Sequence, residues 1–343
     1  MLEIKNLNKN YDLASGETIH VLKNINFKID RAKITAIIGP SGSGKSTLSK
    51  CLSLLEQPTS GELILDGIIL NQLSSEALRL QRKKIGLVFQ SSALLKRRTA
   101  AENIALPLQF LGVIDQQVKE RVQYLLENVQ LLDRANHYPC QLSGGQQQRV
   151  AIARALALQP QIIIADEATS GLDPDATQSI LKLLTELRDE LGLSVILITH
   201  EMDVVRQIAD EVAVLSHGEL IENGHVLDLI LNPASQIGKK ILPLKIPSNL
   251  PSNHVVILLT YSSLYGTPLN WLSQLSKHVD IQFDIHASTV EQICDQTVGK
   301  IILSISADLY FQYQNIIDQH LSLLKIQSEL IHIPEIYNHI FAA

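Results

Sequence analysis

The stretch GPSGSGKS at residues 39–46 decides how the surrounding chain folds, because it matches the pattern G-x-x-x-x-G-K-[S/T] in full. The apolar run ITAII at residues 34–38 precedes it, and a helical pattern at residues 46–55 follows it. Glycines let backbone N–H groups wrap phosphate oxygens, and a helix N-terminus adds partial positive charge. Strand, loop and helix in this order predict a nucleotide-binding loop and disfavour a glycine-rich turn that binds nothing. The predicted nucleotide-binding residues of the loop are Gly39, Pro40, Ser41, Gly42, Ser43, Gly44, Lys45, Ser46 and Thr47.

Two residues of this loop and two at a later strand end carry the predicted chemistry. Lys45 would reach the β- and γ-phosphates, and the Ser46 hydroxyl would bind Mg²⁺. The apolar run at residues 162–165 ends in Asp166 and Glu167. A carboxylate beside the phosphates suits Mg²⁺, and a second one can act as a general base toward water. We therefore expect Asp166 to bind the metal and Glu167 to activate the attacking water, with Lys45 as a further catalytic group.

A third motif, LSGGQ at residues 142–146, opens a helical run at residues 147–158. Its glycines and helix start suit a phosphate for the same reasons as the first loop. One chain then has two phosphate-binding loops, and two chains arranged head to tail could complete each other's nucleotide sites. This pattern predicts a symmetric dimer of the chain. The predicted nucleotide contacts of the motif are Ser143, Gly144, Gly145 and Gln146.

Two domains are expected from the length of 343 residues, because single cores stop growing near about 250–300 residues. Residues 1–232 alternate buried strand-like runs with helices, which predicts an α/β domain whose parallel sheet is covered on both faces. Within it, residues 92–158 are mostly helical in pattern and predict a helical insert. The Pro- and Ser-containing stretch at residues 233–252 indicates a linker.

The remaining chain shows the order β-α-β-β-α-β over residues 253–334, which is the plan of a small ferredoxin-like α+β domain, and residues 335–343 form a short tail. The strand at residues 279–287 is expected to be half-buried, because its apolar and polar residues alternate strictly. The last helix is expected to present Tyr313, Ile316, Ile317, His320 and Leu324 on one face. The expected strands lie at residues 254–261, 279–287, 301–306 and 326–333, and the helices at residues 268–278 and 309–324.

Composition limits the classes of partner and compartment. The apolar fraction of 45% and charged fraction of 19% indicate a folded globular chain, and a formal charge of −6 predicts no nucleic-acid partner. Cys51, Cys140 and Cys294 lack metal-ligand spacing, so we expect them to be reduced, with Cys51 in the core. No signal-peptide pattern is found, and no apolar run approaches the about 20 residues of a membrane-spanning helix. If the protein serves transport, another polypeptide must span the membrane.

Together the three motifs resemble the ATP-binding-cassette family, whose fold is a P-loop NTPase domain with a helical subdomain. The resemblance implies ATP and Mg²⁺ as cofactors, and it implies roles for four further residues. Gln90 resembles the glutamine that contacts Mg²⁺ and faces the membrane partner. Asp173, in the sequence SGLD at residues 170–173, resembles part of the loop that crosses the dimer interface. His200 resembles the switch histidine that contacts the γ-phosphate, and Tyr11 resembles the aromatic residue that stacks on adenine.

The chain also resembles, over nearly its whole length, the ATPase subunits of bacterial methionine importers. The stretches LITHEMDVV at residues 197–205 and RTAAENIALPL at residues 98–108 are typical of that group, as is a ferredoxin-like domain after a linker. The resemblance implies a peripheral ATPase on the cytoplasmic face of the inner membrane, powering import of methionine or related amino acids through a separate permease. It also implies an external substrate-binding protein and feedback inhibition by methionine at the C-terminal domain. The chain departs from the group at residues 91–93, where Phe-Asn is usual, and at Gln282 and Ala287.

Other functions are open from the sequence. One alternative is the ATPase of a different transporter of the family, for another amino acid or for lipoprotein release or export, with a tail used only for dimerisation. A soluble ATPase of translation or DNA repair usually carries two cassettes or a long coiled coil, whereas this chain has one cassette and no heptad run. A phosphotransferase would need a pocket for a second substrate, which no sequence feature suggests.

Overall fold

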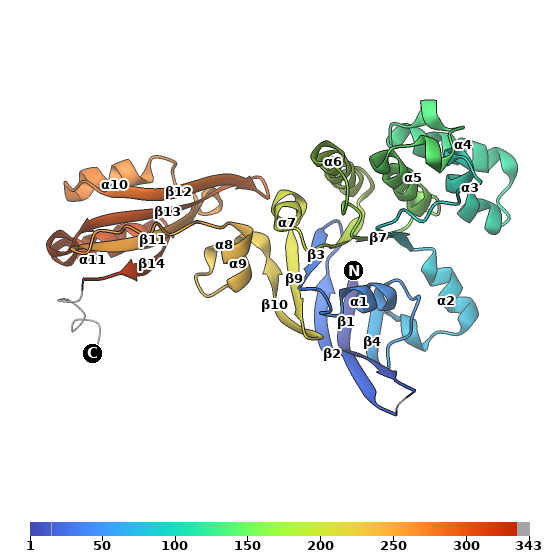
Figure 1. The fold of residues 1–343 in the computed structure, drawn as a ribbon, viewed down its shortest axis with the longest axis horizontal. Coiled ribbons are helices and arrows are strands. Elements are labelled where there is room, and N and C mark those ends of the chain that lie inside the picture. The colour runs from blue at the N-terminus through green and yellow to red at the C-terminus, as the bar shows by residue number, and fades with distance from the viewer. Residues whose placement is uncertain (15, 335–343) are drawn as a thin grey trace. The chain divides into compact units, whose positions relative to one another are not determined.

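The structure, a computed structural model, describes residues 1–14 and 16–334 (Figure 1). It divides the chain into two compact units, Met1–Asn223 and the residues from Gly224 onward, and each is described by itself. The domain bounds expected from the sequence, at residues 232, 252 and 334, remain a prediction. The tail expected at residues 335–343 lies outside the described residues.

The first unit contains two sheets. The antiparallel sheet has the strand order β2-β1-β4-β5, and the second sheet has the order β10-β9-β3-β8-β7-β6. In the second sheet β3, β6, β7, β8 and β9 run parallel, and the whole of β3 is buried, as expected for a parallel sheet covered on both faces. The strands are β1 Leu2–Asp12, β2 Thr18–Ile29, β3 Ile34–Ile38, β4 Ser60–Leu65, β5 Ile68–Ile69, β6 Ile85–Val88, β7 Ile162–Asp166, β8 Ser194–Ile198, β9 Glu211–Ser216 and β10 Glu219–His225.

Two hydrophobic cores lie on the two faces of the second sheet. Ile163 of β7 packs with the helices α3 to α6, whereas its neighbour Ile164 packs with α1 and the antiparallel sheet. Successive strand residues point to opposite faces, so one continuous apolar run serves both cores. The helices are α1 Lys45–Leu52, α2 Ser75–Arg82, α3 Ala100–Phe110, α4 Asp115–Asn128, α5 Gly144–Leu156, α6 Pro174–Leu191 and α7 Met202–Ile208, with 3₁₀ turns at Leu70–Gln72, Leu132–Arg134 and Pro139–Gln141. The expected helical insert is present as α3, α4 and α5, which lie side by side (Figure 1).

Helix α1 ends earlier than the sequence predicts. It stops at Leu52, and Leu54 adopts a left-handed conformation with φ +60°, which breaks the helical path. Leu55, the last residue of the predicted helix, is 56% exposed. Cys51 is fully buried as expected, and burial raises the pKa of its thiol to about 11.

The second unit has the predicted ferredoxin-like order of elements. Its antiparallel sheet has the strand order β12-β13-β11-β14, and α10 and α11 pack on one face through a core that includes Trp271. Two short helices precede the sheet, and one of them lies within the stretch expected to be a linker. The elements are α8 Val226–Leu231, α9 Gln236–Ile241, β11 His254–Ser262, a 3₁₀ turn at Ser263–Tyr265, α10 Trp271–Val279, β12 Asp284–Ile293, β13 Gln296–Ser306, α11 Ala307–Leu323 and β14 Gln327–His332.

The strand predicted at residues 279–287 was misplaced, because β12 begins at Asp284 and runs to Ile293. Val279 is the last residue of α10, Asp280 turns into the left-handed region, and the strand begins only at Asp284. Ile281 is buried while Ile285 is 57% exposed, so the regular alternation in the sequence does not correspond to one buried face. The end of α10, the loop after it and the start of β12 together give an alternation of apolar and polar residues with a period of two, although they do not form one strand.

The predicted buried face of the last helix was partly wrong. Ile317 is buried, and Tyr313 and Leu324 are partly buried against the same core, but Ile316 is 40% exposed. Tyr310 and Leu321, which were not predicted, are buried as well. Among residues 1–14 and 16–334, no helix has both the length and the apolar character needed to span a bilayer.

Candidate functional site

The predicted nucleotide-binding loop connects β3 to α1 and lines a cavity of about 510 Å³. Gly42 and Gly44 have φ angles of +76° and +103°, which side chains with a Cβ rarely adopt. A Cβ at Gly39 would lie 2.1 Å from the Leu215 carbonyl oxygen, so this position also requires glycine. The lining residues are Val21, Gly39, Pro40, Ser41, Gly42, Gly44, Lys45, Ser46, Thr47, Glu167 and His200.

Lys45 is held by the loop that it belongs to. Its ammonium donates hydrogen bonds to the carbonyl oxygens of Gly39, at 2.8 Å, and Pro40, at 3.0 Å. Burial lowers the pKa of Lys45, and the nearby carboxylates of Glu167 and Asp166 partly oppose that effect. The loop is thus shaped around a cation before any phosphate binds.

Two carboxylates approach this cation from the end of β7. Asp166 pairs with Ile198 in the parallel ladder, and burial raises the pKa of its carboxyl although the Ser49 hydroxyl donates a hydrogen bond to it. Glu167 has a φ of +50°, and its N–H donates to the Ile198 carbonyl oxygen at 2.9 Å. This turn places Glu167 Oε1 3.4 Å from Nδ1 of His200.

The structure therefore brings together residues that are far apart in the sequence. Lys45, Glu167 and His200 lie on one cavity because β3, β7 and β8 are parallel and their carboxyl ends meet at one edge of the sheet. The prediction had missed Val21, which lines the cavity, and Ser49, the hydrogen-bond partner of Asp166. Ser49 follows Lys45 by one helical turn of α1, and that spacing was the only available signal.

The residues of the LSGGQ motif lie elsewhere on the first unit. Ser143 caps α5: its hydroxyl accepts from the Gln146 N–H at 3.3 Å, and the Gln146 side chain accepts from the Ser143 N–H at 3.0 Å. A Cβ at Gly145 would lie 3.0 Å from Ala176, at the start of α6. None of the four predicted contacts, which are Ser143, Gly144, Gly145 and Gln146, lines the cavity of the same chain.

Three other predicted site residues make contacts of their own. The amide of Gln90 donates to the Ser170 hydroxyl at 3.2 Å. Asp173 caps α6, where its carboxylate accepts from the Ala176 N–H at 2.9 Å. Tyr11 does not line the cavity.

The Tyr11 hydroxyl forms a short hydrogen bond to Glu56, and the Lys9 ammonium lies 4.9 Å from the centre of its ring. Burial raises the pKa of Tyr11, and the hydrogen bond to Glu56 adds to that effect. A hydrogen bond to Thr47 places Tyr11 beside the loop.

The fold and this cavity define a P-loop nucleotide hydrolase, in which a phosphate loop and a carboxylate pair meet at the end of a parallel sheet. The family described as ABC transporter matches residues 22–170. The chain belongs to that family, and it is an ATP-binding, ATP-hydrolysing cassette. Cassettes of the family dimerise and work with membrane permease subunits.

Curated relatives extend the similarity beyond the cassette. The chain is 46% identical over 308 residues to methionine import ATP-binding protein MetN 1 of Rhodococcus jostii. This alignment covers 90% of each chain. It is 45% identical over 318 residues to methionine import ATP-binding protein MetN of Photobacterium profundum. This alignment covers 89% of this chain and 92% of the relative.

Solved structures resemble the cassette part. The dimeric ATP-binding cassette MJ0796 with ADP and phosphate has 40% sequence identity and a TM-score of 0.60, covering 66% of this chain and 98% of the cassette. The protein cbiO1 of Clostridium perfringens, part of the transporter complex cbiONQ, has 31% identity and a TM-score of 0.60, covering 70% of this chain and 98% of its own.

Proposed function

We propose that this chain hydrolyses ATP to power the import of methionine through separate membrane permease subunits. The observation that carries the proposal is the extent of the similarity to methionine import ATP-binding proteins, which is 40–46% identity over about 90% of the chain. The match to the general cassette family ends at residue 170, so the similarity to methionine importers includes the second unit as well.

The proposed chemistry follows from the cavity. The γ-phosphate would replace the carbonyl oxygens of Gly39 and Pro40 as the partner of Lys45, because a charge-assisted hydrogen bond to phosphate is the stronger one. Glu167 would accept a proton from the attacking water. His200, 3.4 Å from the Glu167 carboxylate, would orient that carboxylate and contact the γ-phosphate.

The residues proposed for Mg²⁺ fit such an ion. Among residues 1–14 and 16–334, no group of three or more His, Cys, Asp or Glu side chains could hold a metal ion. The Ser46 hydroxyl, the Gln90 amide and the Asp166 carboxylate are oxygen donors, and Mg²⁺ prefers a few such donors together with phosphate and water. When bound, Mg²⁺ neutralises charge on the phosphates.

A transport assay distinguishes methionine import from import of another amino acid and from lipoprotein release. The chain, its permease and an external substrate-binding protein would be reconstituted in vesicles with ATP on the face that carries the cassette, the proposed cytoplasmic face of the inner membrane. We expect ATP-dependent accumulation of labelled methionine on the face that carries the cassette. Glu167→Gln should abolish this accumulation. Uptake of a different amino acid without methionine uptake, or release of a lipoprotein, would contradict methionine as the substrate while leaving the ATPase assignment intact.

Feedback regulation is the finer part of the proposal. We propose that methionine binds the second unit and slows ATP hydrolysis by favouring a separated state of the two cassettes. A ligand can do this only if it binds that state more tightly, and a coupling of about 1–3 kcal/mol would change turnover by about 5–150-fold. The test is the ATPase activity of the permease-bound complex against methionine, with and without residues 248–343. Truncation should abolish inhibition and preserve basal hydrolysis; if methionine leaves the full complex unaffected and calorimetry detects no binding, the second unit does not sense it.

A further inference from the structure

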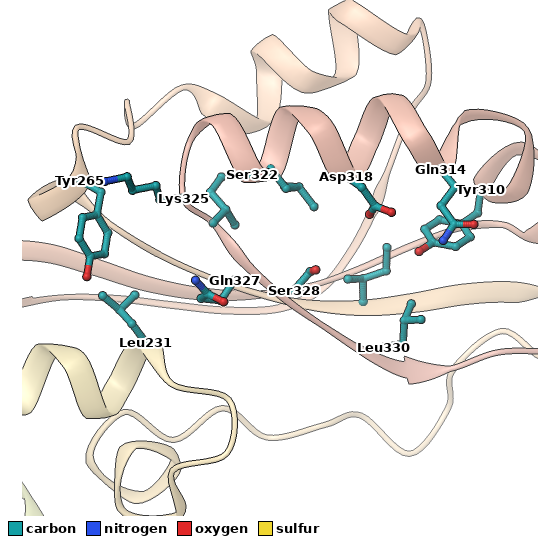
Figure 2. A pocket seen from close by; sticks show the side chains of 13 residues that line it. Leu231, Tyr265, Tyr310, Gln314, Asp318, Ser322, Lys325, Gln327, Ser328 and Leu330 are labelled. Atoms are coloured by element: carbon teal, nitrogen blue, oxygen red, sulfur yellow. The ribbon is translucent and has the colours of Figure 1, made fainter. Parts of the chain in front are cut away.

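A groove of about 850 Å³ runs along the edge of the second unit's sheet, between α11 and β14 (Figure 2). The side chains of Gln314 and Asp318 point from α11 toward β14, and Ser328 and Leu330 point from β14 toward α11. Most of its polar lining residues are exposed, so the hollow is an open groove rather than an enclosed chamber. An open, elongated groove suits an extended chain better than a compact molecule.

The two ends of the groove carry opposite charges. Asp318 lies toward one end, and Lys325 lies at the other, where its ammonium is 5.0 Å from the centre of the Tyr265 ring (Figure 2). Within residues 1–14 and 16–334, neither Asp318 nor Lys325 forms an ion pair. Partial burial raises the pKa of the Asp318 carboxyl, with a hydrogen bond from Gln314 opposing that effect, so a nearby cation would stabilise its charged form.

The strand beneath these charges has a free edge. β14 is the last strand in the order β12-β13-β11-β14, so its outer backbone groups have no partner strand in the part of the chain that the structure describes. Such an edge accepts an added strand through main-chain hydrogen bonds. The floor of the groove is apolar, with Ile257, Leu321 and Ile326 each 5% exposed or less.

The direction of β14 and the distance between Asp318 and Lys325 indicate which kind of ligand fits the groove. β14 runs from the Lys325 end of the groove toward the Asp318 end, so a chain with its amino group at Asp318 and its carboxylate at Lys325 runs antiparallel to β14. α11 covers five of the seven positions from Asp318 to Lys325 and advances about 7.5 Å over them, so the two residues lie roughly 8–10 Å apart along the groove. An extended chain of about three residues, at about 3.3 Å each, covers that distance.

We propose that this groove binds a short peptide with free termini, about three residues long, as a fifth, antiparallel strand beside β14, with its ammonium group at Asp318 and its carboxylate at Lys325. The central side chain would point toward α11 and rest on the apolar side chains of Leu321 and Ile326. This site lies on the edge of the sheet opposite to β12 and is separate from the nucleotide cavity of the first unit.

The experiment uses the full chain and calorimetric titration with four forms of one tripeptide, Ala-Leu-Ala. These are the free peptide, its N-acetyl form, its C-terminal amide, and a form with an N-methylated leucine, which removes one backbone donor. The protein variants are Asp318→Asn and Lys325→Gln, and the matched controls are Glu190→Gln and Lys119→Gln, which remove exposed charges on α6 and α4.

We expect each terminal ion pair, being exposed, to contribute about 3–5-fold in affinity. Asp318→Asn should weaken binding of the free peptide by that factor and leave binding of the N-acetyl form unchanged. Lys325→Gln should weaken binding of the free peptide by the same factor and leave binding of the C-terminal amide unchanged. N-methylation should weaken binding to every protein form, and the controls and ATP hydrolysis should be unaffected. Equal binding of free and blocked peptides, no loss on N-methylation, or no binding of the free peptide at millimolar concentration would each overturn the proposal.

Discussion

Three charged residues, Lys45, Asp166 and Glu167, lie close together at the end of β7, and burial disfavours the charged forms of Lys45 and Asp166. Burial lowers the pKa of Lys45 and raises that of Asp166, and each is partly stabilised by the other's opposite charge. Such an arrangement is typical of a site that acts on a charged ligand, because a phosphate and its metal supply the missing charges. The loop was predictable from its spacing, because strand, loop and helix agree, whereas an apolar run that ends in Asp-Glu is common and gains its meaning only together with the loop.

Contacts of single side chains were less predictable. Tyr11 was assigned to adenine stacking by resemblance, and nothing in its sequence neighbourhood shows that Glu56 and Thr47 bind its hydroxyl. Asp173 is predicted at the dimer interface, and its capping of α6 agrees with the sequence Asp-Pro, which is typical of a helix start. Neither contact excludes the assigned role, which stays a prediction.

The role of Glu167 can be tested directly. Glu167→Gln keeps the shape and hydrogen-bonding capacity of the side chain but removes the base, so ATP should still bind while turnover falls by about 100-fold or more. Nucleotide binding and steady-state phosphate release measure the two effects. The matched change Glu190→Gln, on the exposed end of α6, should leave both unchanged. Turnover near that of the unmodified chain would show that another group accepts the proton.

Asp166 makes the stability of the first unit depend on pH. Burial holds its pKa above the ordinary 3.8, so above that pH the folded state retains a proton that the unfolded state has lost, and stability falls as pH rises through the folded pKa. Asp166→Asn removes this penalty and should raise the melting temperature at pH 7 by about 2 °C, after allowance for solvent screening. The difference from the unmodified chain should disappear at acidic pH. A lower melting temperature at pH 7 would show that the charged form is stabilised instead.

Among the elements, long apolar runs and long amphipathic helices were predicted well, and short connections were not. The strands β3 and β7 were recognised because continuous apolar runs fit a sheet buried on both faces. The hairpin between β12 and β13 was missed because Cys294 and Asp295 both take positive φ, at +50° and +58°, without the glycine that usually marks such a turn. The start of β12 was misplaced for the same reason, since Asp280 ends α10 in a left-handed conformation that the sequence does not mark.

Lys300 of β13 links the sheet of the second unit to α9. It is 5% exposed, and its ammonium donates to the Leu242 carbonyl oxygen at 2.8 Å and the Gly238 carbonyl oxygen at 3.3 Å. Burial, with some repulsion from Lys239, lowers its pKa from 10.5 to about 8. The unfolded state therefore binds more protons between these pH values, so the folded state gains stability as pH rises through that window.

We expect this gain to reach roughly 3 kcal/mol at most between pH 7.5 and pH 10. Denaturant unfolding can be followed by the fluorescence of Trp271, the single tryptophan of the chain and a buried residue of the second unit. Lys300→Met should remove the gain, whereas Lys277→Met, which changes an exposed lysine of α10, should preserve it. The same pH response in Lys300→Met and in the unmodified chain would assign it to other groups.

At the scale of the whole molecule, one chain contains two loops that are predicted to bind phosphate, and only one of them lines the cavity. The loop before α1 lines the cavity, and the exposed loop before α5 lies outside the cavity lining of the same chain. The Ser143 hydroxyl and the Gln146 side chain are occupied in capping, which fixes the shape of the second loop without a ligand. A preformed loop at a helix N-terminus fits a phosphate presented by another copy, and cassettes of this family dimerise. The sequence predicted two separate loops in one chain, because the motifs at residues 39–46 and 142–146 are each complete.

ATP should therefore hold two chains together when hydrolysis is blocked. In Glu167→Gln with ATP and Mg²⁺, light scattering should report the mass of a dimer, and without ATP that of a monomer. Ser143→Asp should abolish the dimer, because Asp still caps α5 but brings a negative charge to the γ-phosphate of the other chain. The matched change Ser74→Asp, at the start of α2, caps a helix in the same way and should leave the dimer intact. A dimer that survives Ser143→Asp would place the contact elsewhere on the cassette, since a carboxylate facing a triphosphate in a water-poor interface repels it whether or not the rest of the interface is well packed.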